Sequence, residues 1–386
     1  MDPLLYADTV FGRPHRTPGD RRAFWYYSPR PIPRDLDLTL PTIAALSRAD
    51  NAIGLLTGFG HLVRDPEMLI GPYLRREALA STRIEGTQTT LDDVLRSEAH
   101  LDEATVDTQE VWQYIDAARL GMELITALPL SQRLITSVHR KLLSGVRGQE
   151  RMPGELRRSP VWVGSATDTP DTAQYVPPLH TDLPDLMTDL ELFANEPSPY
   201  PPLIHAGLLH YQFETIHPFL DGNGRIGRLI VSLYLMQEGR LPAPILYLSG
   251  YLEARRSEYY DRLQAVRERG EIQEWLQFFL TAVERQAVDG ATRARLLVQK
   301  REEYLSEAST SRGRLSVIAD LVFQNPIMTV ARAQSASGLS NQGARNLVGD
   351  AVARGWLTKV GRMSGRDYWI AQDVHQIMQA PLDALT

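Results

Sequence analysis

The sequence predicts a mainly α-helical protein with one β-hairpin insertion and a small C-terminal domain of different pattern. Apolar residues recur at helical spacing over most of the chain from residue 41 to about residue 306. Residues 157–178 instead hold short β-type runs separated by turn residues, and after Ser309 short helices lead into two β-type runs. We therefore divide the chain into an N-terminal arm and helical region (1–105), a helical core (106–308) and a C-terminal domain (309–386).

Composition narrows the class of protein before any motif is considered. The 386 residues include 41 Lys plus Arg and 47 Asp plus Glu, for a net charge of −6, and 43% of them are hydrophobic. Such a chain can bury real cores, and its mild acidity argues against a protein that coats nucleic acid over its whole surface. The absence of cysteine excludes disulfide staples, Cys-ligated metal sites and a cysteine nucleophile. We expect a cytoplasmic protein, because the N-terminal residues lack a signal-peptide pattern and no stretch approaches the roughly 20 apolar residues of a membrane span.

Residues 1 to about 40 are rich in Pro and Arg and predict an extended arm that lies on the body of the protein. Phe24, Trp25, Tyr26 and Tyr27 are expected to anchor this arm, since a disordered tail would rarely carry four consecutive aromatic residues.

Helical periodicity begins at Pro41, which suits a first-turn position. Ile43, Leu46, Ile53 and Leu56 are spaced to share one face of this first helix. Further helical runs are expected at about 66–83, 89–98, 107–127, 131–143, 181–194, 200–215, 224–238, 252–268 and 271–306.

The segment 157–178 interrupts this pattern. It contains the run VWVG, then Ser, Thr, Asp and Pro residues, then QYV before two prolines. Two β-type runs on either side of turn residues predict a β-hairpin over residues 161–176.

The C-terminal domain follows a short polar linker, STSRGR, that starts at Ser309. Two helices, a Gly-Leu-Ser turn, a helix capped by Ser340 and two β-type runs then follow, which is the order of a winged helix-turn-helix domain. Polar side chains near the start of the third helix could read base edges, and two arginines lie on the expected wing. The sequence leaves open whether this domain contacts DNA or protein; the residues concerned are Asn341, Gln342, Arg345, Asn346, Arg362 and Arg366.

The segment with the most chemical information is HPFLDGNGRIGR, residues 217–228, which precedes an apolar helical run. Glycines on both sides of Asn223 allow a sharp turn that presents unpaired backbone N–H groups at a helix N-terminus, where anions bind. Arg225 and Arg228 add guanidinium groups suited to phosphate oxygens. Asp221 supplies a hard oxygen ligand for Mg²⁺, and His217 can take a proton near neutral pH. Each part alone has a structural explanation, but their conjunction predicts attack on a nucleotide phosphate.

This segment matches H-x-F-x-[D/E]-G-N-G-R-x-x-R, the signature of the Fic family, at every fixed position. The upstream run HAGLLHYQFETI, the YVPP after the expected hairpin and the downstream PILYLSGYLEARRSEYYDRLQAV also resemble Fic proteins. The resemblance covers roughly residues 35–370. It implies a Fic-type helical core with a β-hairpin flap, and an enzyme that transfers AMP from ATP to a hydroxyl of a target protein.

The resemblance also implies roles for individual residues. His217 would be the base that deprotonates the target Ser, Thr or Tyr hydroxyl, and Asp221 would hold Mg²⁺ against the α- and β-phosphates. The hairpin at 161–176 would be the flap, which pairs with a segment of the target. The residues implied to contact the nucleotide are the backbone of Gly222, Asn223 and Gly224 as an anion hole, Arg225 and Arg228 on the phosphates, and Tyr259 and Tyr260 at the adenine, although these two tyrosines would serve equally as core aromatics.

A second match is the segment STRIEG, residues 81–86, which resembles the inhibitory motif [S/T]-x-x-x-[E/N]-[G/N] of the Fic branch with an N-terminal inhibitory helix. The resemblance implies that Glu85 pairs with Arg228 and occupies the guanidinium that should hold the γ-phosphate. The same carboxylate could align a water that removes AMP from a modified target.

Two other functions stay open at this stage. One is transfer of another nucleotide or of a phosphate group, and the other is a nucleotide-sensing, DNA-binding regulator. The expected partners are ATP, Mg²⁺ and a target protein, with no membrane. DNA contact and a homodimer are left open.

Overall fold

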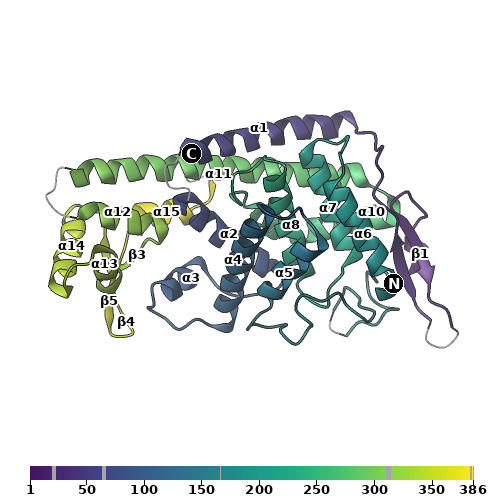
Figure 1. Ribbon diagram of the computed structural model, residues 1–386, viewed down its shortest axis with the longest axis horizontal. Coiled ribbons are helices and arrows are strands. Elements are labelled where there is room, and N and C mark those ends of the chain that lie inside the picture. The colour runs from purple at the N-terminus through teal and green to yellow at the C-terminus, as the bar shows by residue number, and fades with distance from the viewer. Residues whose placement is uncertain (20–22, 63–66, 166, 310–313, 383–384, 386) are drawn as a thin grey trace.

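A computed structural model describes residues 1–19, 23–62, 67–165, 167–309, 314–382 and 385 (Figure 1). The described part of the chain is mainly helical, as expected. Its helices are α1 (Leu40–Leu62), α2 (Glu67–Ile84), α3 (Leu91–Glu98), α4 (Val106–Ile125), α5 (Gln132–Leu142), α6 (Leu183–Asn195), α7 (Pro202–Ile216), α8 (Asn223–Gln237), α9 (Leu248–Ala254), α10 (Arg256–Arg269), α11 (Ile272–Ser309), α12 (Leu315–Gln324), α13 (Val330–Ser337), α14 (Asn341–Ala353) and α15 (Gln372–Gln379), with short 3₁₀ turns at Pro3–Leu5 and His180–Asp182.

Helices α1 and α11 lie side by side along one edge of the molecule (Figure 1). Alanines on α1 allow this close approach, and Gly290 of α11 does the same, because a Cβ at this glycine would lie 2.9 Å from a methyl of Leu56. The predicted face of α1 is confirmed in part: Ile53 and Leu56 are buried and Leu46 packs partly buried, but Ile43 is 46% exposed. Small residues share this contact with larger apolar ones, and the buried positions are Thr42, Ala45, Ala49, Ala52, Ile53 and Leu56.

Helices α7 and α8 form the centre of the molecule. Every residue of α7 from Leu203 to Ile216 is buried, and α8 is buried from its first turn to Leu235 apart from Gly224. A helix that is apolar or buried on all sides belongs in a core surrounded by other helices. The helical run expected over 252–268 is instead two helices, α9 and α10, because the chain turns at Arg255.

The N-terminal residues form a two-stranded antiparallel hairpin where an extended arm was expected. Strands β1 (Gly12–Arg16) and β2 (Trp25–Pro29) pair with each other. Tyr27 is fully buried and Tyr26 nearly so, whereas Phe24 and Trp25 pack partly buried against the same apolar cluster. The aromatic residues therefore anchor this segment, as predicted.

The hairpin expected over 161–176 is reduced to one β-bridge between Val163 and Tyr175. The Val163 N–H donates to Tyr175 O at 2.8 Å, and the turn between them is held by the Asp168 side chain. Strand pairing does not extend further, because the backbone after Tyr175 is bound elsewhere: Val176 O accepts the N–H of Tyr27. We call residues 159–178 the flap segment.

The C-terminal elements form a separate group at the end of α11 (Figure 1). Strands β3 (Ile327–Thr329), β4 (Thr358–Met363) and β5 (Arg366–Ile370) make an antiparallel sheet in the order β3-β5-β4. Helix α14 is capped by Ser340, as predicted. Residues 310–313 of the expected linker lie outside the described residues.

One hydrophobic cluster runs through all three predicted segments, from Phe11 to Met378. Trp356 stacks on Tyr304 of α11 with ring centroids 4.3 Å apart, which joins the C-terminal elements to the helical core. The boundaries at 105/106 and 308/309 therefore separate segments that pack together, and they stay predictions. Among the described helices, none is long and apolar enough to cross a membrane.

Candidate functional site

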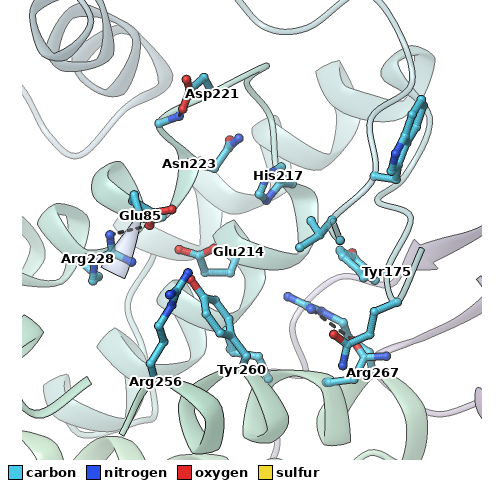
Figure 2. A pocket seen from close by; sticks show the side chains of 18 of the residues that line it. Glu85, Tyr175, Glu214, His217, Asp221, Asn223, Arg228, Arg256, Tyr260 and Arg267 are labelled. Atoms are coloured by element: carbon cyan, nitrogen blue, oxygen red, sulfur yellow. Dashed lines mark hydrogen bonds and ion pairs between the residues drawn. The ribbon is translucent and has the colours of Figure 1, made fainter. Parts of the chain in front are cut away.

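A cavity of about 560 Å³ opens where the end of α7, the start of α8, α10 and the end of α2 meet the flap segment (Figure 2). Its walls include most of the predicted site residues. The lining comprises Glu85, Trp162, Val163, Gly164, Gln174, Tyr175, Glu214, His217, Leu220, Asp221, Gly222, Asn223, Gly224, Arg228, Arg256, Tyr260, Leu263, Gln264 and Arg267.

The loop between α7 and α8 is closed by side-chain hydrogen bonds. The Asn223 amide bonds both backbone groups of Phe219, at 2.8 Å and 2.9 Å. His139 of α5 stacks on the Phe219 ring, accepts the Gly154 N–H at Nδ1, and therefore donates from Nε2 to Asp221 O. No local sequence pattern indicates His139, because its contacts lie 15 and 82 residues away.

The first turn of α8 leaves backbone donors free. Gly222 adopts a left-handed conformation with φ 79° before the helix begins. Its own N–H is taken by Asp221 Oδ1 at 2.5 Å, but the N–H groups of Asn223, Gly224 and Arg225 have no partner within the helix, as in any first turn. This helix N-terminus faces the cavity and can bind an anion.

His217 ends α7 and points into the cavity (Figure 2). Its backbone is left-handed, with φ 50° and ψ 60°. Burial, followed by the charges of Arg157 and Arg267, lowers the pKa of His217 to about 3. The imidazole is therefore neutral near pH 7, which is the form that can accept a proton.

Asp221 and Arg225 form a pair at the rim of the cavity, with Asp221 Oδ1 3.1 Å from Arg225 Nη2. Arg225, which the resemblance implies contacts the phosphates, is instead buried behind the loop, bonded to Asp221, and does not line the cavity. The Asp221 side chain stays 37% exposed. No group of three metal-ligating side chains occurs in the described part of the chain, so a bound Mg²⁺ would take its remaining ligands from phosphates and water, which suits this ion.

Arg228 is completely buried and is held by the end of α2. Its Nε donates to Ser81 Oγ at 2.9 Å, and its Nη2 donates to Ser81 O at 2.8 Å. Nη2 also donates to Glu85 Oε1 at 2.7 Å (Figure 2). Burial raises the pKa of Glu85, but the Arg228 charge outweighs it and the net shift is downward, so the carboxylate is ionised. The contact needs Gly224, because a Cβ there would collide with both Glu85 and Arg228.

The two adjacent tyrosines of α10 have different environments. Tyr260 lines the cavity, whereas Tyr259 is fully buried and bonded through its hydroxyl to His210 Nε2 at 2.9 Å. His210 Nδ1 in turn bonds Gly227 O of α8. Tyr259 therefore belongs to the core, which is one of the two roles that the sequence left open for it, and it does not line the cavity.

Three further charged residues line the cavity and were not predicted. Glu214 lies one turn before His217, and burial raises its pKa to about 7. Arg256 and Arg267 come from α10, and the Arg267 guanidinium lies 3.9 Å from the ring centroid of Tyr175. Only Glu214, three residues before His217 in a helical run, had a position from which a sequence argument could have placed it at the site.

The fold and the cavity define a helical protein with an anion-binding helix N-terminus beside a neutral histidine and a buried arginine. Comparison with known proteins agrees. Residues 43–123 match the Fic/DOC family N-terminal domain, and residues 129–235 match the Fic/DOC family. These two segments are therefore similar to the Fic/DOC family, which agrees with the resemblance of the sequence motifs.

Curated relatives carry the name Protein adenylyltransferase Fic. The proteins from Drosophila grimshawi and Aedes aegypti are each 32% identical to this chain, over 212 and 216 residues, which is 53% of this chain in both cases. The aligned part is 40% and 39% of these relatives, so this chain spans less than half of their length.

Solved structures share the fold. A Fic family protein from Desulfovibrio desulfuricans has a TM-score of 0.57 and 20% identity, and the match covers 88% of this chain and 98% of that chain. Fic-1 from C. elegans has a TM-score of 0.50 and 18% identity, with 68% of this chain and 74% of that chain covered.

Proposed function

We propose that this protein transfers AMP from ATP to a hydroxyl side chain of a target protein, and that Glu85 keeps it in a self-inhibited state. The observation that carries the proposal is the arrangement of His217, the free first turn of α8 and the Glu85–Arg228 pair around one cavity. The name of the curated relatives supports the same reaction.

The proposed reaction is an in-line displacement at the α-phosphorus. The target hydroxyl gives its proton to the neutral His217 ring as its oxygen bonds the α-phosphorus, and the bond from that phosphorus to the α,β-bridging oxygen breaks, so that pyrophosphate leaves. The N–H groups of Asn223 and Gly224 stabilise the charge on the phosphate oxygens. Asp221 would hold Mg²⁺, which neutralises the charge of the leaving pyrophosphate.

Self-inhibition follows from competition for Arg228. The guanidinium is buried, its Nη1 has no hydrogen-bond partner in the described structure, and its Nη2 is already bonded to Glu85. A γ-phosphate must displace this carboxylate before the α-phosphate can lie in line with the attacking hydroxyl. The flap segment would dock the target, since Trp162 and Val163 lie at the mouth of the cavity and Trp162 is 43% exposed.

The C-terminal elements support a winged helix-turn-helix assignment, which we add to the proposal. Their order is helix, strand, helix, helix and β-hairpin. The polar side chains at the start of α14 are exposed, but Arg366 of the hairpin donates to His100 O of the α3 end. This contact favours a domain that packs on its own chain, with DNA contact through α14 as the alternative.

Mass spectrometry of Glu85→Gly protein incubated with ATP and Mg²⁺ tests the proposal. Self-modification by the mass of AMP supports adenylyl transfer. A phosphate adduct, or an adduct formed only with another nucleotide, would contradict adenylyl transfer and support transfer of a phosphate or of another nucleotide. If the adduct is lost on further incubation with the wild-type protein, which keeps Glu85, removal of AMP is a second activity.

A further inference from the structure

Arg157 is among the largest fully buried side chains of the protein, with 2% of its surface exposed. It precedes the flap segment in the chain and does not line the cavity. No carboxylate forms an ion pair with it in the described part of the structure. A buried guanidinium without a charged partner needs several hydrogen-bond acceptors.

Four backbone carbonyls supply these acceptors. Arg157 Nε donates to His217 O at 2.9 Å, and Nη2 donates to Ile216 O at 3.4 Å. The same guanidinium donates from Nη2 to Pro178 O at 2.6 Å and from Nη1 to Ser159 O at 3.3 Å. The backbone N–H of Arg157 also donates to Pro218 O at 2.9 Å. One side chain therefore joins the His217 backbone to both ends of the flap segment.

The His217 backbone needs such support. Its left-handed conformation is disfavoured for any residue with a Cβ, and it persists only where neighbouring contacts fix it. The carbonyls of Ile216 and His217 lie at the C-terminal end of α7, where no N–H of the helix donates to them and where a positive charge is favourable. Arg157 satisfies both requirements.

We propose that Arg157 is a positioning residue, which fixes the direction of the His217 ring and holds the flap segment in register with it. This inference rests on the proposed function, in which His217 takes the proton of a hydroxyl that the flap segment presents. Proton transfer requires the two atoms to be within hydrogen-bond distance, so the base and the docking segment must be placed relative to each other. A single guanidinium bonded to both provides this placement.

The test compares three variants in the Glu85→Gly background. Arg157→Met removes the charge and all four side-chain hydrogen bonds, and Arg157→Lys keeps the charge, but one ammonium cannot bond four carbonyls. Arg158→Met is the matched control, because Arg158 is the next residue, its side chain is 78% exposed, and it pairs only with Glu155. ATP affinity, the single-turnover rate of self-labelling and the NMR signals of the His217 ring are measured for each variant.

We expect Arg157→Met to lower the labelling rate by about 10- to 100-fold while the Kd for ATP changes by less than about threefold, since misplacement of a catalytic group by 1 Å costs about 100-fold. Arg157→Lys should lose rate as well but keep the low pKa of the His217 ring, which separates placement from charge. Labelling by both variants within twofold of the control, or a loss of ATP affinity that parallels the loss of rate, would overturn the inference.

The ring signals keep the test independent of activity. If the control variant binds ATP but labels nothing, the proposed function fails, and the inference about Arg157 is then decided by NMR alone. A His217 ring signal in Arg157→Lys that is unchanged in shift and line width would overturn it. A shifted or broadened signal in a variant with an unchanged Tm would support it.

Discussion

Removal of the Glu85 carboxylate is expected to activate the protein, and the structure sets the size of the effect. Arg228 is buried and its Nη2 lies 2.7 Å from Glu85 Oε1, whose side chain is 31% exposed. A hydrogen bond between charged groups contributes about 1.5–3 kcal/mol. Because each 1.4 kcal/mol is tenfold in an equilibrium, the pair limits the population with a free Arg228 to between about 8% and 1%.

Glu85→Gly should therefore raise the rate of adenylyl transfer by about 10- to 100-fold. The Arg228 guanidinium keeps its two bonds to Ser81 in this variant, so it stays directed toward the cavity. Glu85→Gln should give a smaller increase, because a neutral amide still hydrogen-bonds Arg228 and such a bond contributes about 1 kcal/mol.

Single-turnover labelling with radiolabelled ATP measures the transfer rate, and removal of AMP is followed separately from pre-labelled protein. Glu253→Gln is the matched control, because Glu253 is also 31% exposed and pairs with an arginine of α2, Arg83, but does not line the cavity. If Glu85→Gly protein is folded and binds ATP yet transfers AMP no faster than the Glu253→Gln control, competition for Arg228 is not what limits the enzyme.

Four other outcomes are expected. His217→Ala in the Glu85→Gly background should lower labelling by about 10²- to 10⁴-fold with nearly unchanged ATP binding by calorimetry; transfer within a few-fold of the parent would remove His217 from the mechanism. Burial lowers the pKa of His205 to about 4 from 6.5, so the unfolded chain binds more protons than the folded chain between these pH values. The free energy of unfolding should therefore fall as the pH falls through this window, by up to about 1.4 kcal/mol per pH unit for this group. In urea unfolding, His205→Phe should show a shallower pH dependence than the parent, and an equal slope would contradict the assignment. Gly290→Val should lower the Tm through a collision with Leu56 that costs about 1–3 kcal/mol; Gly54→Val is the comparison, because Gly54 is an exposed residue of α1 and a Cβ there would meet no atom outside its own helix within 4 Å. Deletion of residues 310–386 should lower the Tm, because Tyr304 loses the Trp356 ring. ATP binding should stay measurable, since the residues that line the cavity lie between 85 and 267, and a truncated chain that does not fold would show that the C-terminal elements belong to the core.

Sequence periodicity located the helices because a buried face repeats every 3.6 residues wherever a helix packs. On α1 it identified Ile53 and Leu56, which are buried, but not Ile43, which points to solvent where alanines make the contact. The flap segment does not form the predicted hairpin, because the backbone of Val176 bonds Tyr27, which is far away in the sequence.

The site was predictable where its residues lie within a short motif. The loop from His217 to Arg228 and the contact of Glu85 with Arg228 follow from two short motifs. Tyr259 and Tyr260 could not both face the cavity, because adjacent residues on a helix point about 100° apart. The roles of Arg157 and His139 could not be predicted, because they bond the carbonyls of His217 and Asp221, which lie more than 50 residues away. Such contacts leave no pattern in the sequence.

Because α1 pairs with α11, α1 can complete its packing only after α11 has been synthesised. Thr42 and Gln273, which are hydrogen-bonded to each other, are 231 residues apart. Every residue that lines the cavity, from Glu85 to Arg267, leaves the ribosome before α11 does. The alanine-rich face of α1 therefore stays without its partner through most of translation, and it must be kept from aggregating until α11 emerges. Helix α1 is made before the helices that line the cavity but packs against α11 after them, and closing so long a loop makes this a slow step of folding.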